Sequence, residues 1–135
     1  MDIMLDLETL SVRPDAVILT FGACKFSPYK KHDIVDGIYF RVSVDEQIAL
    51  GRHVDENTVK WWGEQAEDVR EEALGTEGRV PVEQMYKDLN RFLVGVNNIW
   101  AQGPVFDIAI LENLYRQNCW PTPWQFWQIR DSRTL

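Results

Sequence analysis

The first eight residues constrain the fold more than any other part of the chain. Apolar side chains at positions 3, 5 and 7 alternate with the acidic pair Asp6 and Glu8. Residues two apart on a β-strand point to the same face, so this alternation predicts a strand with one apolar and one acidic face. Two carboxylates on one strand face, roughly 6.5–7 Å apart, repel each other and resist loss of water. The acidic face is therefore either exposed to solvent or occupied by a cation.

The rest of the chain alternates between strand and helix patterns. Segments 16–26 and 34–44 are rich in β-branched and aromatic residues and predict two more strands, joined in an antiparallel meander. Helices are predicted at 58–63, 66–74, 81–93 and 104–118, and short strands at 98–101 and 125–129. Three strands, three helices and then strand, helix and strand predict a mixed sheet with helices packed on it.

Composition is that of a single globular domain of 135 residues, with 45% apolar and 26% charged residues. The apolar runs are too short for a membrane span, and Met1 begins no secretory signal, so a cytoplasmic protein without a membrane partner is expected. Cys24 and Cys119 lack ligand spacing and predict two reduced thiols. The net charge of −7 argues against a long phosphate-gripping surface, so any contact with nucleic acid should be short and local.

Another acidic residue lies at the predicted turn from strand to helix. Asp107 follows Gly103 and Pro104 and falls in the first turn of the helix at 104–118. The helix dipole favours an acid at this position, which is one explanation for Asp107. If the strand at 98–101 lies parallel to and beside the first strand, Asp107 instead reaches the same edge as Asp6 and Glu8. Three carboxylates there would suit Mg²⁺ or Mn²⁺, which favour oxygen ligands.

Several stretches together resemble a known nuclease family. Leu5-Asp6-Leu7-Glu8-Thr9 resembles the first motif of the DEDD-type 3'→5' exonucleases. Within that family, four more stretches resemble a phage and bacterial branch that includes exodeoxyribonuclease VIII and the T4 phage exonuclease A: 16–23, Trp61-Trp62, 103–107 and 130–134. The resemblance spans residues 1–135 and suggests a phage or prophage protein. It implies an α/β, ribonuclease H-like fold, in which helices flank a five-stranded mixed sheet of three antiparallel and two parallel strands.

The resemblance also implies an activity and a set of site residues. The implied activity is metal-dependent hydrolysis of phosphodiester bonds from the 3' end of DNA or RNA, with two Mg²⁺ or Mn²⁺ ions roughly 3.5–4 Å apart. The implied catalytic residues and metal ligands are Asp6, Glu8 and Asp107. The terminal nucleotide is expected against Thr9, Leu10 and Phe106, with Leu10 as a wedge. Relatives in this family often self-associate, so a homodimer is a further expectation.

The family's third motif has no counterpart in residues 1–135. That motif supplies a histidine or tyrosine as general base, and a final aspartate, on a helix after the fifth strand. We expect His32 and His53 to be surface residues, and Asp131, within Arg-Asp-x-Arg-Thr, to be structural. The chain is thus expected to be a truncated exonuclease domain with little or no activity. The alternative is a non-catalytic ribonuclease H-like module, descended from an exonuclease, that serves binding or assembly.

The tryptophans carry two further expectations. Trp61 and Trp62 are adjacent, so on a helix they diverge by about 100°, and at least one should be in the core. Packing is favoured over base stacking for both. Trp120, Trp124 and Trp127 cluster near the end of the chain and are expected to leave apolar surface exposed there.

Overall fold

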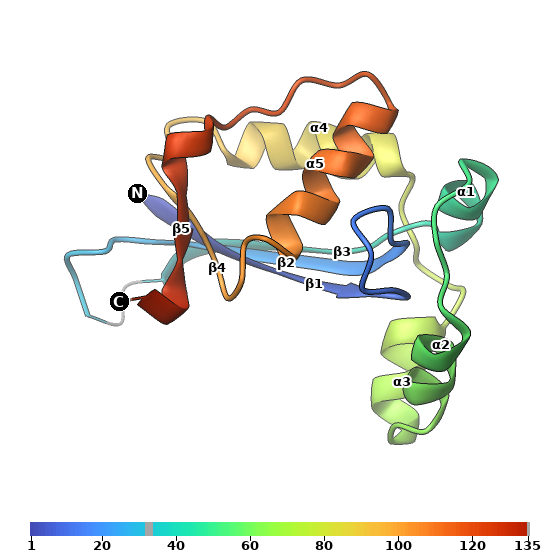
Figure 1. Cartoon of the computed structure of the whole chain (residues 1–135). Coiled ribbons are helices and arrows are strands. Elements are labelled where there is room, and N and C mark those ends of the chain that lie inside the picture. The colour runs from blue at the N-terminus through green and yellow to red at the C-terminus, as the bar shows by residue number, and fades with distance from the viewer. Residues whose placement is uncertain (32–33, 135) are drawn as a thin grey trace.

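A five-stranded mixed sheet with the strand order β3-β2-β1-β4-β5 organises the chain (Figure 1). This computed structural model describes residues 1–31 and 34–134. The first three strands form an antiparallel meander: β1 (Asp2–Thr9), β2 (Ile18–Phe26) and β3 (Ile34–Arg41). Two short strands extend the sheet in parallel: β4 (Ile99–Ala101) and β5 (Ile129–Asp131). The predicted sheet is confirmed.

The helices cover the two faces of the sheet unequally. α4 (Val82–Phe92) and α5 (Asp107–Gln117) lie along one face, above the sheet in Figure 1. At one end of the sheet the chain forms three short helices: α1 (Val44–Ala49), α2 (Glu56–Gly63) and α3 (Glu67–Leu74). α2 and α3 project below the level of the sheet at that end (Figure 1). Asp6 and Glu8 therefore remain exposed on the second face.

The main core lies between the sheet and the helix pair α4 and α5. Ile3, Leu5 and Leu7 of β1 are each no more than 5% exposed and point toward these helices. Each helix packs a stripe of buried apolar side chains, spaced three or four residues apart, against the sheet. The stripes are Val82, Met85, Leu89 and Phe92 on α4, and Ile108, Leu111, Leu114 and Tyr115 on α5. Burial of each such side chain stabilises the fold by about 1.5–3 kcal/mol. The alternation predicted for β1 is confirmed.

Several predicted bounds are wrong near the ends of the meander. The strand predicted over 16–26 begins at Ile18, because Ala16 forms an isolated bridge with His53. The strand predicted over 34–44 ends at Arg41, since Val42 bridges to Val80 instead. The next residue, Ser43, caps α1, a helix that the sequence did not predict.

Two further predictions fail in the second half of the chain. The helix predicted from 104 begins at Asp107, because residues 104–106 form a turn. The strand predicted at 125–129 is a short 3-10 helix, Phe126–Gln128, followed by β5. The Gln128 side chain stabilises that helix by accepting a hydrogen bond from the Gln125 N–H at 2.7 Å.

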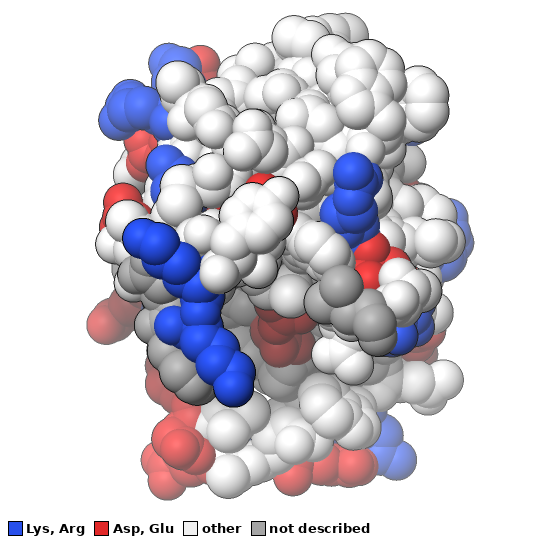
Figure 2. Space-filling view, turned by 90° about the vertical axis from the view of Figure 1, so that its left-hand side faces the viewer, with Lys and Arg blue, Asp and Glu red and all other residues white. Residues whose placement is uncertain are grey.

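The tryptophans divide between the core and the surface. Trp62 is 6% exposed and Trp61 is 53% exposed, so one of the pair is in the core and the other is not. Trp124 is buried and Trp120 stacks on Tyr86 with ring centroids 4.3 Å apart, whereas Trp127 is 61% exposed. Figure 2 views the side that carries β5. Its upper right is uncharged, basic and acidic side chains stand together at the upper left and across the middle, and acidic ones predominate along the lower edge.

Cys24 and Cys119 are both free thiols. Across residues 1–31 and 34–134, no helix has the length and apolarity required to cross a membrane. The predicted turn position of His32 lies outside the described residues.

Candidate active site

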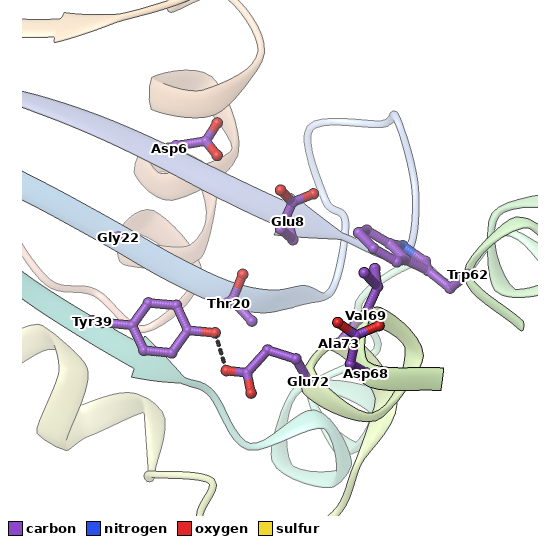
Figure 3. A pocket seen from close by; sticks show the side chains of 10 residues that line it. All are labelled: Asp6, Glu8, Thr20, Gly22, Tyr39, Trp62, Asp68, Val69, Glu72 and Ala73. Atoms are coloured by element: carbon purple, nitrogen blue, oxygen red, sulfur yellow. Dashed lines mark hydrogen bonds between the residues drawn. The ribbon is translucent and has the colours of Figure 1, made fainter. Parts of the chain in front are cut away.

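Asp6 and Glu8 project from the open face of β1. Their neighbours across the ladder on β2 are Gly22, which has no side chain, and Thr20, which has a small one, so both carboxylates stay uncovered. Both acids line a pocket of about 530 Å³ between the sheet and α3. Figure 3 shows the two carboxylates on the same side of β1, facing this pocket. The strand alternation thus accounts for the placement of both residues.

Asp107 reaches the same region through a gap in the sheet. β4 pairs with β1 only at Ile3 and Met4, so the following part of β1 has no parallel neighbour on that edge. The Leu7 N–H donates to Asp107 Oδ2 at 3.4 Å, so the Asp107 carboxylate takes the place of the missing strand partner. The turn before α5 makes this reach possible, because Gly103 adopts a φ of +89° that disfavours other residues.

The three carboxylates interact strongly. Asp107 is only 4% exposed, and burial, together with the charge of Asp6, raises its pKa to about 6. The hydrogen bond from Leu7 acts in the opposite direction and lowers this pKa. Burial, followed by the charge of Asp6, also raises the pKa of Glu8. The cluster therefore favours a bound proton or another positive charge.

The donor set has the chemistry that a divalent cation requires. Asp6, Glu8 and Asp107 offer only carboxylate oxygens, the ligands that Mg²⁺ and Mn²⁺ prefer. Burial, followed by the charge of Asp6, raises the pKa values of Glu8 and Asp107, so a cation placed between these carboxylates would relieve their repulsion. As the side chains stand, no group of three or more His, Cys, Asp or Glu in the described parts of the chain is close enough together to hold an ion. Asp6, Glu8 and Asp107 thus have the oxygen ligands that a divalent cation needs. Their side chains are not gathered around one point.

The wall of the pocket opposite the sheet comes from α2 and α3. Trp62, Val69 and Ala73 supply apolar surface, and the charged residues that line the pocket are all acidic, namely Asp6, Glu8, Asp68 and Glu72. The Tyr39 hydroxyl donates a short hydrogen bond to Glu72, marked by the dashed line in Figure 3. Burial, then this bond to Glu72, raises the pKa of Tyr39 to about 12.

Two arginines hold α3 in place against the sheet. Arg41 on β3 donates to the backbone carbonyls of Glu72 at 2.9 Å and Gly75 at 2.8 Å. Arg79 donates to the carbonyls of Leu19 at 2.9 Å and Val42 at 3.0 Å, and also to the end of α3. These bonds tie the α3 wall to β2 and β3. The sequence did not predict that α3 forms this wall. Tyr39, which bonds to Glu72 of α3, lies directly across the sheet from Gly22, and Gly22 lies directly across from Asp6.

The residues predicted to contact the terminal nucleotide occupy other positions. Leu10 is 5% exposed and packs in a second small core with Val17, Leu19 and Trp62. It borders a separate cavity of about 310 Å³, and the structure does not bring it to the acidic pocket. Thr9 is buried, and its hydroxyl donates to the Ser11 carbonyl at 2.7 Å. Phe106 is half-buried against the main core.

The remaining polar candidates also have local partners. His53 Nδ1 lies 2.5 Å from Ser11 Oγ, outside the acidic pocket and half-buried. Asp131 accepts from the Arg133 guanidinium at 2.7 Å, and this hydrogen bond holds the pKa of Asp131 at about 2. The structural role expected for Asp131 agrees with this pairing.

A solved nuclease structure has a fold similar to that of this chain. The nuclease domain of 3'hExo, a DEDDh family member, solved bound to rAMP, superposes with a TM-score of 0.56 at 11% sequence identity. The match covers 88% of this chain and 60% of that one, so the chain spans about three-fifths of that structure's length. At this identity the likeness shows the fold, which is ribonuclease H-like as predicted. No curated protein matches the chain.

The sheet order and the superposition show a ribonuclease H-like fold, and the matching family model defines the class of the protein. The chain belongs to the family described as the 3'-5' exoribonuclease Rv2179c-like domain, which matches it over residues 1–135. The fold expected from the sequence is thereby confirmed, and the family's description as a 3'-5' exoribonuclease domain agrees with the expected class of protein.

Proposed function

We propose that this domain is a metal-dependent 3'→5' exonuclease that removes nucleotides from RNA, with Asp6, Glu8 and Asp107 as its catalytic carboxylates. The observation that carries the proposal is the convergence of Asp107 on Asp6. The two acids lie far apart in the sequence, yet Asp107 accepts a hydrogen bond from Leu7, the neighbour of Asp6, and burial with the charge of Asp6 raises the pKa of Asp107 to about 6. The description of the family as an exoribonuclease domain supports RNA as the substrate.

The three carboxylates would hold the divalent cations, Mg²⁺ or Mn²⁺. When bound, such a cation lowers the pKa of water and stabilises negative charge on a phosphate oxygen. The chain's own contribution is to place the scissile phosphate at the acidic end of the pocket. The apolar surfaces of Trp62, Val69 and Ala73 would receive the base of the terminal nucleotide at the other end.

We expect this polypeptide to act slowly. A positioned general base contributes about 10²–10⁴-fold to a rate. His53 is bound to Ser11 and does not line the acidic pocket. The residues of the chain that line that pocket offer carboxylates and one tyrosine as candidate bases. Fast trimming of RNA by the 135-residue chain would show that one of these groups, or His32, acts as an efficient base.

The test follows a 5'-labelled single-stranded RNA in Mn²⁺ under an excess of protein. We expect a ladder that shortens from the 3' end, and a loss of at least about 100-fold in Asp6→Ala, because even weakening the support of a metal ligand costs 10–100-fold. Asp45→Ala is the matched control, since Asp45 lies in the first turn of α1. DNA of the same sequence tests the sugar preference. Equal rates in wild type and Asp6→Ala would refute the proposal.

A non-catalytic binding module is the second candidate. It is favoured by the observation that no three metal-binding side chains are gathered together in the described residues. Calorimetry separates the two candidates, because an exonuclease should bind Mn²⁺ in a manner that Asp6→Ala abolishes. A binding module need not bind the ion at all.

Other expectations from the sequence stay predictions. They are a homodimer, a cytoplasmic location, contacts of Thr9, Leu10 and Phe106 with the terminal nucleotide, and descent from the branch of exodeoxyribonuclease VIII and the T4 phage exonuclease A. Leu10 would have to leave its buried position to act as a wedge.

A further inference from the structure

We propose that Trp62 is a positioning residue for Glu8, because its indole N–H fixes the end of β1 from which Glu8 enters the pocket. The proposal rests on the proposed function, since it concerns the same acidic site. It goes beyond that function by assigning a role to a helix residue that carries no charge and belongs to none of the acidic motifs.

The pairing of β1 with β2 becomes irregular directly after Glu8. Residues 2–8 of β1 pair in unbroken register with residues 26–20 of β2. Thr9 then pairs with Ile18, so Leu19 is passed over. Such a bulge redirects the side chains beside it and removes local ladder hydrogen bonds. The end of β1 thus needs support from outside the sheet to hold Glu8 in one orientation.

Trp62 supplies that support. Its indole N–H donates to the Thr9 carbonyl at 2.9 Å in a buried position. A buried carbonyl without a donor is costly, so this bond holds the backbone next to Glu8 in place. The Trp62 side chain also belongs to the same small core as Leu10 and Leu19, the residue passed over at the bulge. Figure 3 shows Trp62 beside the end of β1, next to Glu8.

Trp61 provides a matched control within the same helix. Its ring meets that of Trp62 edge-on at 4.8 Å, but it is 53% exposed, whereas Trp62 is 6% exposed. Changing either residue to phenylalanine removes one indole N–H from α2. Only the change at position 62 removes the hydrogen bond to the backbone beside Glu8.

The experiment is calorimetric titration of Mn²⁺ into wild type, Trp62→Phe, Trp61→Phe and Glu8→Gln, together with the double variant Trp62→Phe/Glu8→Gln. Loss of a group that orients a metal ligand typically weakens metal affinity about 10–100-fold. We expect Trp62→Phe to weaken Mn²⁺ binding about 10-fold by the same principle, and Trp61→Phe to leave it unchanged. If Trp62 acts through Glu8, its substitution should add no further loss in the Glu8→Gln background.

Stability effects are separated from positioning by a packing control. Leu19→Ala loosens the same small core and leaves the indole N–H in place, so it should lower the melting temperature without weakening Mn²⁺ binding. Trp62→Tyr, which also lacks the indole N–H, replaces Trp62→Phe if the latter does not fold. Binding in the Trp62 variant equal to that of Trp61→Phe overturns the inference, as does full additivity with Glu8→Gln.

The failure of this inference can be told apart from the failure of the proposed function. If Asp6→Ala abolishes Mn²⁺ binding and the Trp62 variants do not weaken it, only the role of Trp62 is wrong. If Asp6→Ala and wild type bind Mn²⁺ equally, the acidic site itself is not a metal site and both proposals fall.

Discussion

The two faces of the sheet differ in almost every physical property, although they are made by alternate residues of the same strands. One face is buried, with Leu5 and Leu7 packed against α4 and α5. The other presents Asp6 and Glu8 to an open pocket whose charged residues are all acidic. The covered face holds the fold together through apolar burial. The open face carries carboxylates whose mutual repulsion a cation would relieve, so the main core and the proposed function lie on opposite sides of one strand.

The largest expected effect tests the covered face. Leu111 on α5 is fully buried in the main core, and Leu111→Ala should reduce the free energy of unfolding by about 2–5 kcal/mol, through lost burial and a residual cavity. Urea unfolding measures the loss. Leu50→Ala is the matched control, because Leu50 is 37% exposed and should lose much less. A small loss at Leu111 would mean that the covered face is not the main source of stability.

The next substitution tests the acidic face and should raise, not lower, the free energy of unfolding. Asp107 has a pKa of about 6 in the folded protein, above its ordinary value near 4. Between about pH 4 and pH 6, the folded state therefore keeps a proton that the unfolded state has released. Stability should fall as pH rises through this window. Without metal, Asp107→Asn should be more stable than wild type by about 1–3 kcal/mol at pH 7.

The same pair of proteins, unfolded in urea at several pH values with a chelator present, provides the check. Near pH 3 the difference between Asp107→Asn and wild type should vanish, because the aspartate is then protonated in both states. Added Mn²⁺ should stabilise wild type more than the variant, since a ligand bound only by the folded state raises its stability. A variant less stable than wild type at pH 7 would break the contrast between the two faces.

The smallest effect concerns the tie between the open face and α3. Tyr39 is 54% exposed and donates to Glu72, so Tyr39→Phe should cost less than about 1 kcal/mol of unfolding free energy. Tyr29→Phe is the control, because Tyr29 is 95% exposed. A loss comparable to that of Leu111→Ala would show that the pocket wall contributes to the stability of the whole fold.

The sequence predicted the features that depend on local periodicity. Alternation along β1 gave the two faces and the shared orientation of Asp6 and Glu8, and the apolar stripe on α4 was read from helical spacing. The expectation that Asp107 lies near Asp6 required a further assumption, that the strand predicted at 98–101 lies parallel to and beside β1, and the parallel pairing of β4 with β1 confirms that assumption.

Features that depend on contacts between distant segments could not be predicted in this way. α1 was missed because its capping residue, Ser43, follows a strand without any break in composition. The α3 wall is held by Arg41 and Arg79 bonded to backbone carbonyls, and carbonyls have no signature in a sequence. The bond from Trp62 to Thr9 joins residues 53 positions apart, and nothing local marks either as a partner.

The early end of the pairing between β4 and β1 has a consequence for how this site could change. Asp107 occupies a backbone position that one more residue of parallel ladder would otherwise fill, because it accepts the Leu7 N–H. A longer β4 would therefore compete with the carboxylate for the same donor. A change in the length of β4 would therefore change the position of Asp107, and the acidic cluster depends on β4 ending after three residues.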